Sequence, residues 1–106
     1  MKYINILGTQ YEVIKQTEKE NPKLKDINGL CEPYTRQIIY VEQEADIEVF
    51  DNIEAFNRKT LRHEVIHAFF AESGLTEYME DEVLVEWIAV QFPKISRVMK
   101  ELGISE

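Results

Sequence analysis

The chain has 106 residues, of which 44% are hydrophobic and 30% are charged, a balance typical of a folded globular protein. Its net charge of −8 argues against nucleic-acid binding, which relies on clustered lysine and arginine to neutralise phosphates. No apolar run approaches the length of a membrane span and no secretory signal is evident at the start, so we expect one domain, residues 1–106, away from the membrane.

The first half of the sequence predicts strands. Residues 2–7 and 10–16 alternate loosely between apolar and polar side chains on either side of a glycine, which predicts a hairpin. After a polar segment at 17–26, a turn at Asn28-Gly29 introduces a second pair of strands near 30–34 and 37–42. We therefore expect a small antiparallel sheet of three to four strands.

The second half predicts helices, beginning after an acidic run. Residues 42–54 hold six acids and no base, which is typical of a solvent-exposed loop or helix start. Asp51 or Asn52 can cap a helix that starts at about residue 53. Apolar residues then follow helical spacing until Gly74, which stands where a helix C′ residue belongs.

Two further helices are expected near the end of the sequence. The apolar pattern predicts one over about residues 80–92, and Pro93 is suited to the first position of a third, short helix that ends at Gly103. Strands followed by two to three helices make an α+β fold.

The chain has two histidines, His63 and His67, and both lie in the first predicted helix, with Glu64 directly after the first. Residues at i and i+4 are about 40° apart around a helix axis and about 6 Å apart along it, so both imidazoles leave the same face and can bind one zinc ion. Glu64 lies about 100° further round, where it can take a proton from a zinc-polarised water and return it to a leaving amine. The alternative is that both imidazoles are polar groups at the edge of the core, with no metal.

A catalytic zinc ion normally has three protein ligands, and the third must be a carboxylate here, because no third histidine and only one cysteine, Cys31, are present. Glu86, in the second predicted helix, has apolar helical neighbours, and a carboxylate buried among them needs a cation or a proton. Glu82, one turn earlier, shares that face but belongs to the acidic start of the helix. We expect Zn²⁺ to be bound by His63, His67 and Glu86, with Glu82 as the rival.

The motif HEVIH at 63–67, followed by a helical glutamate, resembles the gluzincin zinc metallopeptidases. The stretch EWIAVQF at 86–92 is similar to the E-x-x-A-N-x-F pattern of the ImmA/IrrE-type peptidases of bacteria and phages, in which the glutamate is the third zinc ligand and falls on Glu86. The resemblance covers about residues 28–93 and implies a minimal zincin-like fold. The sequence departs from the pattern at Val90, because gluzincins often carry an aspartate, and ImmA/IrrE-type proteins an asparagine, four residues after the ligand glutamate.

Three functions follow as hypotheses. The first, which we favour, is a zinc-dependent peptidase that hydrolyses a peptide or protein substrate with Glu64 as the general base. The second is a zinc protein that is latent or depends on a partner, since the ImmA/IrrE resemblance implies cleavage of a repressor in a stress or phage-induction circuit. The third is a metal-free interaction module. The single cysteine fits a reducing compartment, so we expect the cytoplasm.

Overall fold

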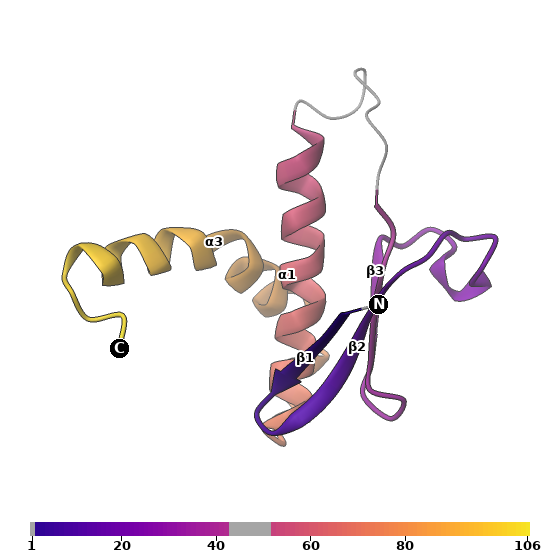
Figure 1. The fold of residues 1–106 in the computed structure, drawn as a ribbon, viewed down its shortest axis with the longest axis horizontal. Coiled ribbons are helices and arrows are strands. Elements are labelled where there is room, and N and C mark those ends of the chain that lie inside the picture. Colours follow the sequence, from indigo (N-terminus) through magenta and orange to yellow (C-terminus); the bar gives the residue numbers. More distant parts are fainter. Residues whose placement is uncertain (1, 43–51) are drawn as a thin grey trace.

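A computed structural model of the chain describes residues 2–42 and 52–106. The first range forms a four-stranded sheet and a short 3-10 helix, and the second forms three helices, two of them long (Figure 1). The predicted α+β fold is therefore confirmed. Most of the acidic run, including Asp51, lies outside the described residues.

The sheet has the strand order β1-β2-β4-β3. Its strands are β1 (Lys2–Ile6), β2 (Thr9–Lys15), β3 (Gly29–Glu32) and β4 (Gln37–Tyr40), with the 3-10 helix η1 (Pro22–Leu24) between β2 and β3. The β1–β2 and β3–β4 pairs are antiparallel, as expected, but β4 pairs with β2 in parallel, so the prediction of an entirely antiparallel sheet is wrong.

Burial explains why β4, and not β3, lies next to β2. Ile38 and Ile39 are consecutive in β4 and are 0% and 3% exposed, so both faces of this strand are apolar and buried. β3 contains Gly29 and Cys31 and has no fully buried residue, which suits the edge of the sheet. Because the chain reverses direction twice between β2 and β4, placing β4 beside β2 makes that pair parallel.

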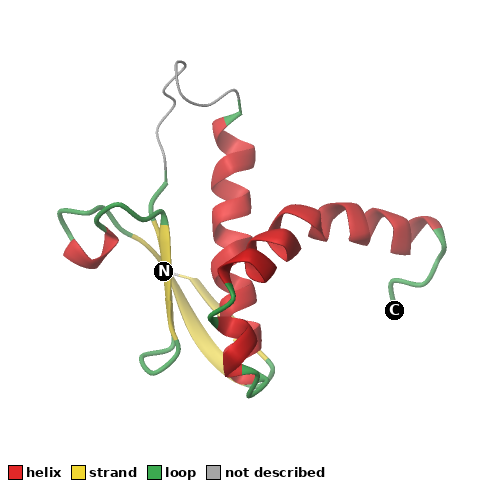
Figure 2. Cartoon of the chain, turned by 180° about the vertical axis from the view of Figure 1, so that it is seen from behind, coloured by secondary structure: helices red, strands yellow, loops and turns green. Residues whose placement is uncertain are grey.

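One face of the sheet packs against α1 (Ile53–Glu72), which stands beside it in Figures 1 and 2. Ile6, Tyr11 and Ile38 from the sheet meet Ala68 of α1 in a cluster whose members are almost completely buried. The hydroxyl of Tyr11 donates a 2.7 Å hydrogen bond to Glu72 in the last turn of the helix. The packed face of α1 is therefore fixed relative to the sheet along its C-terminal half.

The predicted ends of α1 are confirmed. The side chain of Asn52 accepts a hydrogen bond from the backbone N–H of Ala55, as a helix cap does, and Gly74 follows the C-cap residue Ser73 with a positive φ of 75°. Two further helices follow, α2 (Thr76–Met79) and α3 (Glu82–Glu101). None of the helices in the described ranges combines the length and apolar content needed to cross a bilayer.

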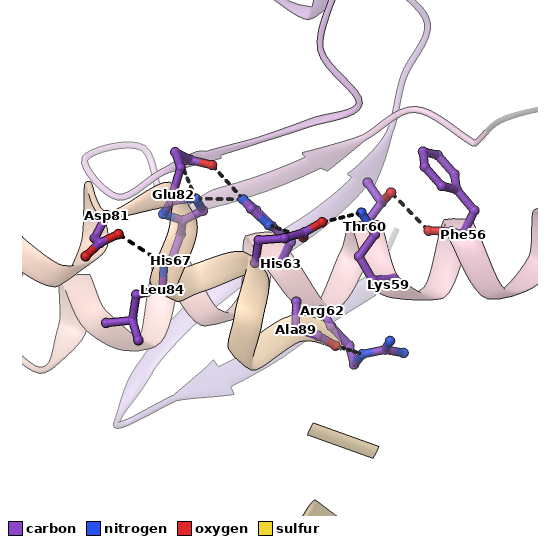
Figure 3. Close-up of polar contacts among 11 residues, drawn as sticks. Phe56, Lys59, Thr60, Arg62, His63, His67, Asp81, Glu82, Leu84 and Ala89 are labelled. Atoms are coloured by element: carbon purple, nitrogen blue, oxygen red, sulfur yellow. Dashed lines mark hydrogen bonds and ion pairs between the residues drawn. The ribbon is translucent and has the colours of Figure 1, made fainter. Parts of the chain in front are cut away.

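α3 does not break at Pro93, so the prediction of a separate third helix is wrong. Proline lacks the N–H that would bond to the carbonyl four residues earlier, which here is that of Ala89. That carbonyl instead accepts a 2.8 Å hydrogen bond from Nε of Arg62 in α1 (Figure 3). A side chain from another helix thus replaces the missing donor, and α3 continues.

This contact predicts a measurable coupling between Arg62 and Pro93. We expect Arg62→Met to lower the free energy of unfolding by about 1–2 kcal/mol, because the carbonyl of Ala89 loses its donor. In a Pro93→Ala background the loss should be smaller, since residue 93 then supplies an N–H to the same carbonyl. Urea unfolding of the four proteins measures the coupling, and Arg58→Met, an exposed neighbour, serves as a control that should change stability by less than about 0.5 kcal/mol. Equal losses in both backgrounds would contradict this account.

Candidate metal centre

The predicted site residues line an open cleft of about 810 Å³ between α1, β3 and the start of α3. α1 contributes His63, Glu64 and His67, and α3 contributes Glu82 and Glu86. Residues 26–31, at and before the edge strand β3, form the opposite wall. The cleft therefore brings together every side chain that the sequence singled out for metal binding or catalysis.

His63, His67 and Glu82 form a group that could hold a metal ion. Nε2 of His63 lies 2.9 Å from one carboxylate oxygen of Glu82, and Nε2 of His67 lies 2.9 Å from the other. The two Nε2 atoms are 3.1 Å apart, and Figure 3 shows both rings turned toward Glu82. The i, i+4 spacing in α1 thus places both imidazoles on one face, as expected.

These distances are in the range that coordination of a metal ion requires. With Zn–N bonds of about 2.0–2.1 Å and tetrahedral angles, two ligand nitrogens lie about 3.3 Å apart. The observed 3.1 Å between the Nε2 atoms is close to that value. The donor set of two imidazoles and a carboxylate is also one that zinc uses in open sites with three protein ligands.

Glu86, which the sequence favoured over Glu82, is not a member of that group. One of its carboxylate oxygens lies 3.0 Å from Nδ1 of His63, the ring nitrogen opposite Nε2, and the other accepts a 3.0 Å hydrogen bond from Nζ of Lys59. The side chain is 43% exposed, so it is not the deeply buried carboxylate that its apolar helical neighbours suggested. Burial acts to raise the pKa of Glu86, but hydrogen bonds from Lys59 and His63 outweigh it and lower the pKa.

Both imidazoles are oriented by their second nitrogens. An ionised Glu86 can accept the proton of Nδ1 of His63, and in that tautomer Nε2 is left to bind a cation. His67 forms a hydrogen bond with the backbone of Met79. Because Nε2 of His67 faces Glu82, the nitrogen that bonds to Met79 is Nδ1. Burial lowers the pKa of His67 and so favours its neutral, ligand form, although Glu82 acts in the opposite direction.

Glu64 lies against the edge strand, where Gly29 makes room for it. The residue is only 6% exposed. A Cβ atom at Gly29 would lie 2.8 Å from Cγ of Glu64 and 3.0 Å from Oε2, closer than side chains tolerate. Glycine at this position therefore lets the carboxylate of Glu64 pack directly against the backbone of β3.

Burial also makes Glu64 an unusual acid. Desolvation raises its pKa from 4.5 to about 7, with a smaller opposing effect of His63. The carboxyl group is therefore poised to bind and release a proton near neutral pH. Cys31, on the same wall of the cleft, has a pKa raised to about 12, chiefly by burial, and its thiol stays protonated.

Sequence reasoning missed two residues of the site. Lys59 stands four residues before His63, so helical spacing alone places both on the same face of α1. On that face its positive charge can balance the negative charge of a ligand or positioning glutamate. Gly29 gave only a turn signal, because its close approach to Glu64 depends on how α1 packs on the sheet.

Comparisons with known proteins identify no relative. No protein-family model matches the chain, and neither a curated protein nor a solved structure matches it.

The contact between Gly29 and Glu64 can be tested by mutation. We expect Gly29→Ala to cost about 1–3 kcal/mol of stability, because the new methyl group has to displace the carboxylate of Glu64. Combined with Glu64→Ala, the same change should cost clearly less, since the obstructing side chain is gone. Denaturant unfolding of the single and double variants measures both. A cost that is the same in the two backgrounds would show that Glu64 is not the obstacle.

The raised pKa of Glu64 predicts a pH dependence of stability in the metal-free protein. Because the folded pKa is above the unfolded value of 4.5, the stabilising contribution of the protonated form is complete below pH 4.5 and is lost as the pH rises through about 7. The stability of Glu64→Gln relative to the native chain should therefore increase by about 2–3 kcal/mol between about pH 5 and 8. Unfolding in the presence of a chelator measures this difference. Glu101→Gln, at an exposed position, serves as the control, and a flat difference for Glu64→Gln would refute the shift.

Proposed function

We propose that this protein is a zinc-dependent hydrolase of peptide bonds. The observation that carries the proposal is the convergence of two imidazole Nε2 atoms, 3.1 Å apart, on one carboxylate in an open cleft. The buried carboxyl group of Glu64, next to the first histidine, adds a proton acceptor with a pKa of about 7. In the metal-free protein the same atoms can share imidazole protons in hydrogen bonds, and a bound ion would take the place of those protons.

In this proposal Glu82 is the third ligand and Glu86 is a positioning residue. Glu82 contacts both Nε2 atoms, whereas Glu86 contacts the opposite nitrogen of His63. With Glu82 as the ligand, the match to the E-x-x-A-N-x-F pattern, which places the ligand at Glu86, is given up. The wider gluzincin pattern, which often has an aspartate four residues after the ligand glutamate, is approached instead. Four residues after Glu82 stands Glu86, another carboxylate. Lys59 keeps Glu86 ionised and so keeps His63 in the tautomer that can bind a metal.

Glu64 is the general base and then the general acid. When bound, a zinc ion supplies a Lewis acid that makes a water molecule nucleophilic near neutral pH. Glu64, whose carboxyl pKa is about 7 in the metal-free protein, would accept the proton of that water and return it to the leaving amine. Its burial against Gly29 restricts the carboxylate to one side of the cleft.

The walls of the cleft favour an extended substrate with basic character. β3 is an edge strand, and residues 27–31 line the cleft, so an extended peptide can add to the sheet beside the site. Asp26 and Glu80 add two more acids to the lining, and among the described lining residues Lys59 is the single lysine or arginine. A negative cleft of this kind attracts cationic side chains.

Zinc binding by variants tests the ligand assignment. We expect one zinc per chain by elemental analysis, and loss of tight binding in His63→Ala, His67→Ala and Glu82→Ala. Glu86→Gln should retain the metal with an affinity weaker by about 10–100-fold, as orienting carboxylates do. Glu80→Ala, in the same cleft but outside the group, should bind normally. Loss of zinc in Glu86→Gln combined with normal binding in Glu82→Ala would reverse the assignment of the two glutamates.

Hydrolysis of a fluorogenic peptide library by the zinc-loaded protein tests the catalytic role. We expect Glu64→Gln to keep its zinc and to lose about 10²–10⁴-fold in kcat/KM, because the proton acceptor is gone while the ligands remain. Full activity of Glu64→Gln would rule out its role as the base. Stoichiometric zinc with no cleavage of any peptide by the native chain would instead favour the latent, partner-dependent protein.

A further inference from the structure

The C-terminal half of α3 projects away from the rest of the chain. In Figures 1 and 2 the helix crosses α1 and then extends to one side, clear of the sheet. The radius of gyration is 14.7 Å, whereas a compact chain of this length has a value of about 13 Å. We call residues 93–104 the α3 arm.

An apolar stripe runs along the arm. It consists of residues that alternate by four and three positions, the spacing of a coiled-coil seam: Ile88, Phe92, Ile95, Met99 and Leu102. The last four are between 37% and 67% exposed. Such a face on a helix usually packs against another element, but no element among the described residues covers the arm in Figure 1.

The stripe continues into an apolar groove between α1 and α3. The groove has a volume of about 710 Å³ and is lined by Leu61, Val65 and Phe69 of α1 and by Ile88 and Phe92 of α3, among others. Phe69 is 42% exposed. Groove and stripe thus form one continuous apolar surface, larger than scattered exposed side chains would make.

We propose that this surface binds a second copy of the same chain. The two α3 arms lie antiparallel about a two-fold axis, so that Met99 and Leu102 of each arm reach the groove beside Ile88 of the other copy. The groove accepts a helix and the arm is a helix, so one chain carries both halves of an isologous contact.

Charge supports a second copy as the occupant. On a heptad frame the positions that flank the stripe are neutral: Ala89, Gln91, Ser96, Val98 and Gly103. The charged residues of the arm, such as Lys94 and Arg97, lie on its outer face. Two identical chains of net charge −8 repel each other, but here they can meet along a strip without opposing like charges.

The area available is also that of a weak dimer. Seven large apolar side chains on this surface or at its edge are 37–67% exposed: Phe69, Leu75, Phe92, Ile95, Val98, Met99 and Leu102. At about 150 Å² or more for each large side chain, they offer on the order of 500 Å² per copy. The total of about 1,000 Å² is at the low end of specific interfaces, so a weak, concentration-dependent dimer is expected.

Sedimentation equilibrium of the full chain tests the proposal. We expect a mass that rises with concentration toward twice the monomer's 12.5 kDa. The double variant Ile95→Glu/Met99→Glu and the single variant Leu102→Glu should remain monomeric. Association of either variant would bury a charged carboxylate in the apolar interface, which is costly. Arg97→Glu, on the outer face of the same arm, is the matched control and should dimerise like the native chain. Circular dichroism verifies folding, and Leu102 is 67% exposed at the helix end, where substitution leaves the fold intact.

Several outcomes would overturn the proposal. A native chain that stays at 12.5 kDa at high concentration has no such dimer. If both stripe variants still dimerise, the dimer uses another surface. If Arg97→Glu is as monomeric as the stripe variants, the cause is added negative charge in general and not the stripe. A monomer that binds an acidic amphipathic peptide, as Arg58 and Arg62 in the groove would favour, identifies a different occupant. Zinc binding should be the same in all variants, so this test is independent of the proposed hydrolase.

Discussion

The site depends on the crossing of α1 and α3, where two consecutive residues of α1 contact α3 in different directions. Arg62 donates a hydrogen bond to the carbonyl of Ala89, and His63 lies between the carboxylates of Glu82 and Glu86. Because neighbouring residues on a helix point about 100° apart, these contacts act in different directions and fix both the position and the rotation of α3. A metal group requires ligand atoms placed to within about 0.5 Å, which a crossing held at one point would not provide.

The same arrangement concentrates negative charge. Glu64, Glu82 and Glu86 lie around two imidazoles, and Lys59 is the basic side chain that partners one of them. Without a cation, Glu64 has a raised pKa, chiefly because it is buried, and the two remaining acids add to the rise by repulsion. A divalent ion would neutralise these charges and join the two helices, so binding would stabilise the crossing as well as complete the site.

The parts of the structure that sequence predicted correctly are set by local interactions. Asn52 and Gly74 end α1 through contacts within a few residues, and the i, i+4 histidines share a face in any helix. The errors come from contacts between distant segments. Pro93 does not end α3 because Arg62, from another helix, bonds to the carbonyl that proline leaves without a donor. The sequence also left Glu82 and Glu86 as rivals on one face of α3, and which of them contacts both Nε2 atoms depends on how α3 crosses α1, which neither helix encodes alone.

α1 and α3 each use two separate faces. The residues that line the cleft and those that line the apolar groove do not overlap, although both sets come largely from these two helices. On α3, the direction of Glu82 and Glu86 differs by about 140° from the mean direction of the stripe that begins at Ile88, at 100° per residue. A copy bound along the stripe would therefore leave the cleft beside β3 open. Each chain of such a dimer would keep a complete site of its own, because His63, His67 and Glu82 all come from one chain.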